Sequence, residues 1–319
     1  MGSQESKSTS RFNLTAQNVV DECSKAIDMG RLYVLVTGAT SGIGLETARV
    51  LACNGAHVYL MGRQEQKVQE SVDQINQELK EKSSTGFVEG VVFDLNSLAS
   101  VKNFADDFNH KQKRLNILIL NAGILSIRFA QTVDGLEQVM GVNHIAHAYL
   151  TQLLIPSLIA NAPSRVVVVS AKLHEGPPLD YEAFQQQSMN TDDAKKSWAI
   201  LRSYQQSKLA NVLYARVLAN QYKDQQITAY SLHPGVIRTN LGGNQFLAGL
   251  VIMFFKKKSI EQGAATTVFC ALQPDLEEHT GRYFDDSTVT DLADKWTDDD
   301  LTRFREWTET IIQERTAKN

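Results

Sequence analysis

The sequence predicts a single domain of the doubly wound α/β class, in which helices cover both faces of a parallel β-sheet. From Leu32 onward, apolar strand-like runs alternate with helical segments without a break in composition. Several runs, such as the four valines at 166–169, are apolar at every position, as expected of strands buried on both faces. A glycine-rich turn joins the first of these strands to the helix that follows it. With 319 residues and 43% hydrophobic content, the chain can bury one large core.

Residues 1–30 are polar at first and weakly helical from about residue 16 to residue 29, and we expect an N-terminal extension to a domain that spans 31–319. Strands are expected at 33–36, 57–61, 90–93, 117–120, 165–169, 227–232 and 283–284. Helices are expected at 45–52, 65–82, 98–111, 136–158, 202–222, 259–272 and 298–314. Because parallel strands are joined by right-handed crossovers, this alternation predicts a doubly wound sheet.

The composition narrows the class of protein. A formal net charge of −4 without a basic stripe argues against nucleic acid as a partner. The three cysteines, Cys23, Cys53 and Cys270, are scattered, which favours free thiols in a reducing compartment over disulfides or a zinc site. The first residues lack the apolar core of a secretory signal, and no apolar run reaches the length of a membrane-spanning helix. We therefore expect a cytoplasmic protein with no metal site.

The turn between the first strand and the first helix predicts a phosphate site. Gly38 gives the backbone freedom that a tight turn needs, Gly42 leaves room for a ligand, and Gly44 lets the helix approach the strand. The helix then directs its free amide groups at a pyrophosphate. The same turn contributes Thr40, Ser41 and Ile43 to the expected cofactor site. A ligand-free glycine turn is the alternative, but the strand before it and the helix after it favour a dinucleotide.

Ligands of such sheets lie beyond the carboxyl ends of the strands, so the residues that follow each strand are candidates. Arg63 follows the second strand, where an NAD site usually has an acidic residue, and an arginine there can pair with the 2′-phosphate of NADP. Glu65 is a competing carboxylate that would favour NAD instead. After the third strand, Asp94 either accepts a bond from the adenine amino group or caps the next helix. The remaining cofactor candidates after these strands are Leu95, Asn121, Ala122 and Gly123.

A tyrosine and a lysine on the predicted helix at 202–222 are candidates for the chemistry. Tyr204 and Lys208 are four residues apart, so both side chains project from one helical face. An ammonium beside a phenol favours the phenolate, and we expect it to lower the pKa of Tyr204 toward neutrality. Tyr204 could then exchange a proton with a substrate oxygen while a hydride moves at a nicotinamide.

These residues together resemble the short-chain dehydrogenases/reductases, whose Rossmann-type domain would span about residues 32–315. The resemblance rests on the turn at 37–44, Asp94, Asn121-Ala122-Gly123, Val142-Asn143-His144, Tyr204 with Lys208, and Pro234-Gly235 followed by Thr239. Residues 142–147, 207–213 and 262–267 are similar to those of the retinol dehydrogenases, and closer still to the catalytic domain of the WW-domain-containing oxidoreductase.

The resemblance implies further roles. Asn143 would hold a water and a backbone kink near the active lysine. Tyr204 and Lys208 would also belong to the cofactor site, together with Pro234 and Gly235, and Lys208 would bind the nicotinamide ribose. Thr239, beyond the Pro234-Gly235 turn, would contact the carboxamide side of the cofactor. Together with Arg63, which favours NADP, the resemblance implies an NADP(H)-dependent oxidoreductase that interconverts an alcohol and a carbonyl.

The chain departs from the family at the end of the fifth strand. The family has two serines there and uses the second, whereas this chain has Ser170 followed by Ala171. Losing one pre-placed hydrogen-bond donor costs roughly 10²–10³ in rate. Either a bulge re-aims Ser170 and restores activity, or the protein is a slow or inactive relative that still binds NADP, with an interaction or signalling role.

The segment after the Pro-Gly turn suggests the substrate. Residues 246–255 are apolar and three lysines follow, at 256–258. An apolar lid predicts a hydrophobic carbonyl substrate such as a retinoid, a steroid or a lipid aldehyde. The same segment, Phe246 to Lys258, could instead contact a membrane surface or be a buried helix. Gly2 and Ser6 match the myristoylation pattern. The sequence is also compatible with a homodimer.

Overall fold

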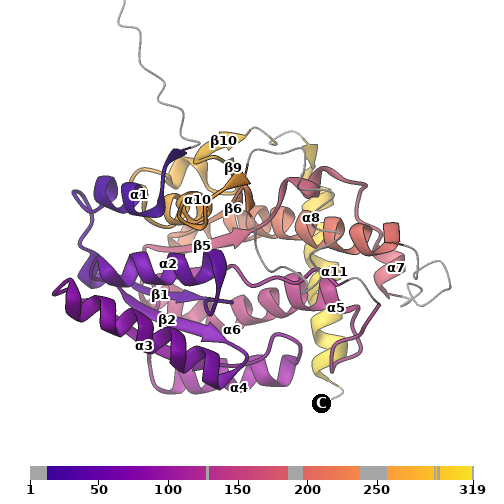
Figure 1. The fold of residues 1–319 in the computed structure, drawn as a ribbon. Coiled ribbons are helices and arrows are strands. Elements are labelled where there is room, and N and C mark those ends of the chain that lie inside the picture. Colours follow the sequence, from indigo (N-terminus) through magenta and orange to yellow (C-terminus); the bar gives the residue numbers. More distant parts are fainter. Residues whose placement is uncertain are drawn as a thin grey trace, which may run out of the picture.

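The computed structural model describes residues 13–126, 129–185, 197–237, 257–290, 292 and 295–317. Within these residues, eight strands form one sheet in the order β10-β9-β6-β5-β4-β1-β2-β3 (Figure 1). They are β1 Tyr33–Val36, β2 His57–Gly62, β3 Phe87–Val92, β4 Ile117–Leu120, β5 Ser164–Val169, β6 Ile227–His233, β9 Tyr283–Asp285 and β10 Thr288–Thr290. All neighbours pair in parallel except β9 and β10, so the predicted doubly wound parallel sheet is confirmed.

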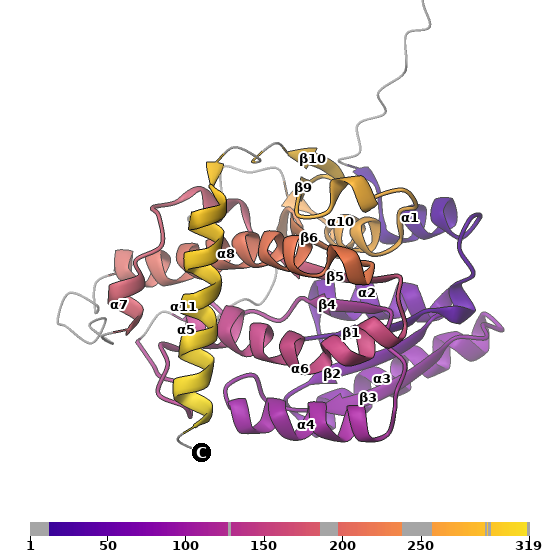
Figure 2. The same cartoon turned by 180° about the vertical axis from the view of Figure 1, so that it is seen from behind.

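The helices cover both faces of this sheet. They are α1 Ala16–Cys23, α2 Gly42–Cys53, α3 Glu65–Glu81, α4 Leu98–His110, α5 Gln138–Met140, α6 Ala146–Ala160, α7 Tyr181–Gln185, α8 Ser197–Gln221, α10 Ile260–Leu272 and α11 Asp298–Thr316. One buried cluster joins the sheet to α1, α2, α3 and α10, and the other joins it to α4, α6, α8 and α11 (Figures 1 and 2). Successive residues of β1 alternate between these clusters, with Leu35 in one and Val34 and Val36 in the other.

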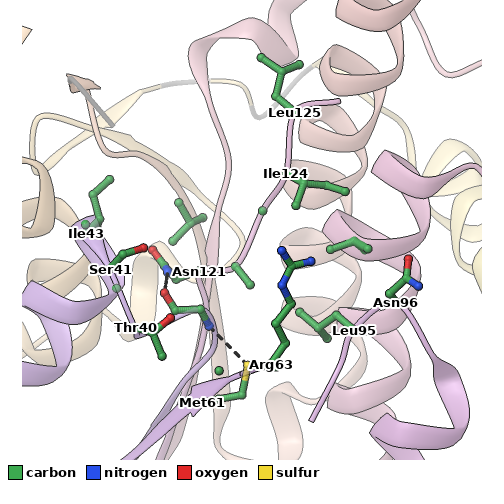
Figure 3. Close-up of a pocket in the computed structure, with 18 of the residues that line it drawn as sticks. Thr40, Ser41, Ile43, Met61, Arg63, Leu95, Asn96, Asn121, Ile124 and Leu125 are labelled. Atoms are coloured by element: carbon green, nitrogen blue, oxygen red, sulfur yellow. Dashed lines mark hydrogen bonds between the residues drawn. The ribbon is translucent and has the colours of Figure 1, made fainter. Parts of the chain in front are cut away.

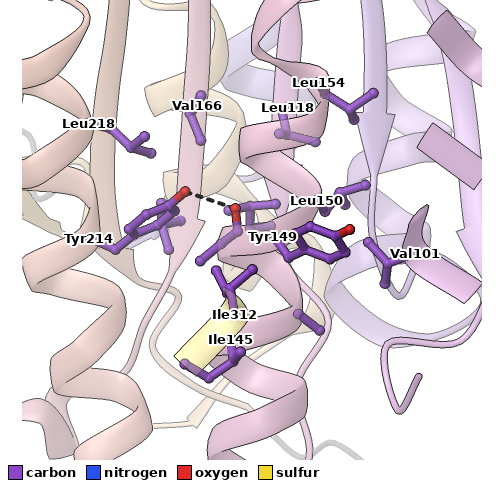
Figure 4. Packing of buried hydrophobic residues seen from close by; sticks show 14 of the residues in the cluster. Val101, Leu118, Ile145, Tyr149, Leu150, Leu154, Val166, Tyr214, Leu218 and Ile312 are labelled. Carbon is purple, nitrogen blue, oxygen red and sulfur yellow. Dashed lines mark hydrogen bonds between the residues drawn. The ribbon is translucent and has the colours of Figure 1, made fainter. Parts of the chain in front are cut away.

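Close packing fixes the helices on the α8 face. Leu118 of β4 and Val166 of β5 are fully buried beneath Leu150 of α6 and Leu218 of α8, and Ile312 of α11 belongs to the same cluster (Figure 4). On the opposite face, α1 lies along α10 and buries four side chains: Ala16, Val19, Val20 and Cys23. This part of the N-terminal extension is thus joined to the main core.

The predicted helix at 136–158 differs from the structure. It is divided into α5, a π-helical turn at Gly141–Ile145 and α6. Such a turn inserts an extra residue into the helical ladder and redirects the side chains and carbonyls around it. The apolar pattern of the segment continues through the turn, so periodicity alone does not reveal the break.

The order of the strands creates the place for a ligand. The chain runs from β1 outward to β2 and β3, and then returns to the other side of β1 to form β4. Connections therefore leave β1 and β4 in opposite directions, and a crevice opens between them at the carboxyl ends of the strands. The glycine-rich turn after β1 lies at this point.

Candidate active site

A cavity of about 870 Å³ lies at the carboxyl ends of the parallel strands (Figure 3). Most residues that the sequence predicts for the site line it: Gly38, Thr40, Ser41, Gly42, Ile43, Gly44, Arg63, Asp94, Leu95, Asn121, Ala122, Gly123, Ser170, Tyr204, Lys208 and Pro234. Asn143 is fully buried behind the lining residue Ile124, and Gly235 follows Pro234 beyond the lining. Thr239 lies outside the described residues. One cavity thus joins the glycine-rich turn to the tyrosine and lysine of α8.

The glycine-rich turn has the geometry of a phosphate cradle. Gly38 has a φ of +65°, and a Cβ there would lie 2.8 Å from the Cα of Ala122. A Cβ at Gly44 would lie 2.4 Å from the carbonyl oxygen of Gly38, so only glycine lets α2 start this close to the strand. Ser41 precedes α2 without donating or accepting a side-chain cap bond, which leaves the first amide groups of the helix for a ligand. A dinucleotide pyrophosphate therefore fits this turn.

A hydrogen-bond network ties this turn to the end of β4. The hydroxyl oxygen of Thr37 accepts from the amides of Asn121 and Ala122 at 2.9 and 3.0 Å. The side-chain amide of Asn121 donates to the carbonyl of Thr37 at 2.9 Å. These bonds hold the residues after β1 and β4 at a fixed separation. The sequence places Thr37 in the turn at 37–44 but predicts no role for it, because the bonds of its side chain depend on residues distant in sequence.

The end of the cavity next to β2 carries two cations. Arg63 extends from the end of β2 toward Ile124 and Leu95 (Figure 3), and Lys67, on the first turn of α3, also lines the cavity. Both are exposed, and neither forms an ion pair with any residue of the described ranges. Glu65, the predicted competitor, does not line the cavity. Lys67 was missed by sequence reasoning, although its spacing of four from Arg63 signals a shared surface.

The alternative reading of Asp94 as a helix cap is wrong. Ser97 caps α4 and accepts from the amide of Ser100, whereas the carboxylate of Asp94 accepts from the amide of Asn96 at 2.9 Å. Asp94 therefore shapes the loop after β3 through an Asx turn, and it lines the cavity. Asn96 and Gln138 line the cavity as well and bond to each other, and neither was predicted.

Tyr204 and Lys208 lie together in α8, with the Lys208 ammonium 5.6 Å from the centre of the Tyr204 ring. The ammonium donates to the carbonyl of Val169 at 3.1 Å. Burial lowers the pKa of Lys208 to about 8 and raises the pKa of Tyr204 to about 12. The expectation that the ammonium lowers the tyrosine pKa is therefore wrong, because desolvation of the phenolate raises it.

Asn143 lies in the π-helical turn and connects three parts of the site. Its side-chain oxygen accepts from the amide of Ile124 at 2.7 Å, and its amide donates to the carbonyl of Ile124 and the hydroxyl of Ser207, both at 3.0 Å. A Cβ at Gly123 would come within 3.5 Å of the Asn143 oxygen and 3.4 Å of the Lys208 nitrogen. The backbone kink that the resemblance implies at Asn143 is present as the π-helical turn.

Ser170 is buried at the end of β5, and its hydroxyl donates to the backbone carbonyl of Lys208 at 2.6 Å. The strand carries no bulge there, because β5 pairs with β6 in unbroken register up to Val169 and Leu232, and the Ser170 amide continues the ladder to Leu232. The suggestion that a bulge re-aims Ser170 is therefore wrong. Ala171 follows, and it precedes a 3₁₀ turn at Lys172–Glu175.

The predicted membrane segment is only partly described. Residues 238–256 and residues 1–12, including Gly2 and Ser6, lie outside the described residues. Lys258 is described, and its side chain is 2% exposed and paired with Asp286. Its stem packs over Gly235, where a Cβ would lie 2.6 Å from the lysine Cδ. Within the segment that could contact a membrane surface, Lys258 is therefore not available to lipid head groups, since its charge is neutralised inside the fold. No helix in the described part of the chain is long and apolar enough to cross a membrane.

The fold and this site define an oxidoreductase of the short-chain dehydrogenase class. Residues 32–179 match the model of the short chain dehydrogenase family. Mouse retinol dehydrogenase 14 is 38% identical over 85% of this chain and 82% of its own length. The human WW domain-containing oxidoreductase is 34% identical over 87% of this chain and 67% of its own. A protein of Mycobacterium paratuberculosis has a similar structure, with a TM-score of 0.64 and 30% identity over 86% of this chain and 84% of that one. The chain belongs to the short-chain dehydrogenase family.

Proposed function

We propose that the protein is an NADP(H)-dependent oxidoreductase that interconverts an alcohol and a carbonyl on an apolar substrate. The observation that carries the proposal is the continuity of the cavity, which extends from the glycine-rich turn and Arg63 to Tyr204 and Lys208. A dinucleotide laid along this cavity would place its pyrophosphate at the start of α2 and its nicotinamide beside α8.

The choice of NADP over NAD rests on the two cations at the adenosine end. Arg63 and Lys67 would pair with the 2′-phosphate, and a guanidinium suits a phosphate because it donates two parallel hydrogen bonds. An NAD site would need an acceptor for the ribose hydroxyls at this place, and the carboxylate closest in sequence, Glu65, does not line the cavity.

The residues of α8 would transfer the proton that the substrate oxygen gains or loses. When bound, the nicotinamide supplies hydride transfer. Tyr204, whose pKa of about 12 keeps the phenol protonated at neutral pH, would donate its proton to the carbonyl oxygen of the substrate. Lys208 would hold a positive charge beside the tyrosine and stabilise the phenolate that forms. Asn143 would keep the loop after β4 against Ser207, which in turn donates to the carbonyl of Tyr204. A protonated tyrosine is the form that reduction of a carbonyl requires.

The substrate class is inferred from apolar groups. Ile124 and Leu125 line the same cavity as Tyr204, and the sequence after Ile237 continues into the apolar run at 246–255. Similar proteins are named as retinol dehydrogenases. We therefore propose a retinoid, a steroid or a lipid aldehyde as the substrate.

A second candidate function is that of an NADP-binding pseudoenzyme with an interaction or signalling role. It is favoured by Ala171, which has no hydroxyl, and by Ser170, whose hydroxyl is bonded to the carbonyl of Lys208. The cavity can then bind the cofactor while the substrate carbonyl lacks a second donor. Tyr204, Lys208 and Asn143 are all present, which favours slow turnover over none.

The test is NADPH oxidation against all-trans-retinal, a steroid ketone and a long-chain aldehyde, with NADPH affinity measured in parallel. Turnover of any of these that disappears in Tyr204→Phe supports the enzyme. Tight NADPH binding without turnover of any of the three supports the pseudoenzyme. Failure to bind either nucleotide refutes both.

A further inference from the structure

A buried histidine connects the two halves of the site. His147, on the first turn of α6, is 1% exposed. Its Nε2 lies 3.0 Å from the hydroxyl oxygen of Thr37, and its Nδ1 lies 3.1 Å from the backbone carbonyl oxygen of Asn143. One imidazole therefore contacts both the glycine-rich turn and the π-helical turn that carries the asparagine.

The hydrogen-bond partners of the ring determine which of its two nitrogens carries the proton. A carbonyl oxygen only accepts, so Nδ1 must carry the hydrogen that faces Asn143. In the neutral ring Nε2 is then bare. The Thr37 hydroxyl lies 3.3 Å from the carbonyl oxygen of Ile119 and 3.0 Å from Nε2, and it donates its one proton to the nearer acceptor, Nε2. The hydroxyl oxygen keeps its two lone pairs for the amides of Asn121 and Ala122. The opposite tautomer would place a bare Nδ1 against the carbonyl and give the hydroxyl oxygen three donors for two lone pairs.

The surroundings keep the ring neutral. Burial, together with the nearby Lys208 cation, lowers the pKa of His147 to about 4, and the carbonyl of Asn143 opposes this only in part. The other titratable neighbour, His144, is also buried and neutral, with a pKa lowered to about 3. A neutral ring with a fixed tautomer is the form that both hydrogen bonds require.

We propose that His147, as a neutral imidazole protonated on Nδ1, is a positioning residue that holds the glycine-rich turn and the Asn143 turn at a fixed separation. The hydrogen bonds run in one direction, from the amide of Asn121 through Thr37 to Nε2, and from Nδ1 to Asn143. The side-chain amide of Asn143 donates to the hydroxyl of Ser207, and this hydroxyl donates to the carbonyl of Tyr204, so the hydrogen-bond network extends to α8. Such a connected, fully satisfied network rigidifies the groups that it joins. The inference rests on the nucleotide site proposed above.

The first test is a double-mutant cycle on NADPH affinity. His147→Leu and Thr37→Val are each expected to weaken NADPH binding about tenfold, the effect of one lost hydrogen bond within a fixed site. The double variant should bind within about threefold of either single variant, because both changes break the same connection. His147→Gln, which keeps a donor and an acceptor, should recover binding to within about threefold of wild type.

His144→Leu is the matched control. His144 is equally buried in the same turn, but its Nε2 lies 3.1 Å from Thr308 of α11, away from the cofactor site. His144→Leu should lower the melting temperature as His147→Leu does, but its NADPH affinity should stay within about twofold of wild type. Unchanged affinity in His147→Leu, or additive losses in the double variant, would overturn the proposal.

The second test needs no variant. In protein labelled with ¹⁵N-histidine, the wild-type His147 ring should show a protonated Nδ1 and a bare Nε2 from about pH 5 to pH 8. A ring protonated on Nε2, or one that titrates in this range, overturns the proposal even if His147→Leu does not fold. A wild-type protein that binds no NADPH refutes the proposed function instead, and the tautomer measurement still decides the role of His147.

Discussion

The hydroxyl of Ser170 donates to the backbone carbonyl of Lys208 at 2.6 Å, so the serine that directly follows β5 is bonded to the helix that carries the candidate lysine. The next position, where the family has its second serine, is Ala171. Successive residues of an extended strand face opposite ways, and β5 is regular up to this point. The remaining serine therefore stabilises the junction of β5 and α8, and under the proposed function the substrate lacks the hydroxyl donor that the resemblance implies at position 171.

Restoring that hydroxyl should raise activity. Ala171→Ser is expected to increase kcat for carbonyl reduction by about 10²-fold, because one pre-placed donor contributes roughly 10²–10³. Steady-state NADPH oxidation measures the change. Ser170→Ala is the matched control: it should lower stability by about 1 kcal/mol through the lost bond to Lys208 and give no gain in rate. An unchanged kcat in Ala171→Ser would show that the missing hydroxyl does not limit the reaction.

Removing the phenol should separate chemistry from binding. Tyr204→Phe keeps the ring under Lys208 but removes the proton donor, and we expect kcat to fall by about 10²–10⁴. NADPH affinity should stay within about threefold of wild type, since the phenol is proposed to meet the substrate oxygen and not the nucleotide. Single-turnover kinetics and calorimetry measure the two quantities. Full activity in Tyr204→Phe contradicts the proposed role.

The cations at the adenosine end should set nucleotide preference. Arg63→Ala is expected to weaken NADPH binding about tenfold or more and to leave NADH binding within about twofold, because only NADP has the 2′-phosphate. Lys67→Ala should act in the same direction with a smaller effect, since an ammonium lacks the paired donors of a guanidinium. Lys82→Ala, on the far end of α3, serves as a control for net charge. Equal losses for both nucleotides would assign Arg63 to the fold instead of the phosphate.

Lys208 should destabilise the fold in a pH-dependent way. Its folded pKa is lowered from 10.5 to about 8, so between these values the unfolded chain keeps a proton that the folded chain has released. The cost of burying the charge is therefore present in full below pH 8, and it is relieved as the pH rises toward 10.5. Lys208→Met should raise the free energy of unfolding at pH 7 by at most about 3 kcal/mol, a gain that disappears above about pH 10. Urea unfolding at several pH values measures it.

Lys258 is a second buried lysine, and Lys258→Met should change stability in the opposite direction to Lys208→Met. Its ammonium is paired with Asp286, so removing it leaves a partly buried carboxylate without its partner and should lower stability at pH 7.

The opposite outcome for Lys208 would contradict the prediction made for it. A loss of stability in Lys208→Met at pH 7 would show that the bond to Val169 outweighs the cost of burying the charge.

Local rules made the glycine-rich turn predictable. Gly38 and Gly44 occupy positions where a Cβ would collide, and α2 starts where a phosphate-binding helix must start. Arg63, Asn121 and the pair on α8 follow from the rule that ligands lie beyond the carboxyl ends of parallel strands. These inferences need only short-range spacing and the alternation of strands and helices.

The features that the sequence did not predict depend on long-range packing. The π-helical turn at Asn143 keeps an unbroken apolar pattern, so its break appears only when the bonds to Ile124 and Ser207 are known. The raised pKa of Tyr204 depends on burial by residues distant in sequence. Lys258 looks like part of an exposed basic run until its pairing with Asp286 is seen.

The most direct test of the proposed nucleotide site is titration of the folded protein with NADPH and with NADH by isothermal calorimetry. We predict saturable binding of one NADPH per chain, with weaker binding of NADH because Arg63 and Lys67 meet only the 2′-phosphate. Absence of heat from both nucleotides, in protein whose circular dichroism and cooperative unfolding show it to be folded, would contradict the proposed site.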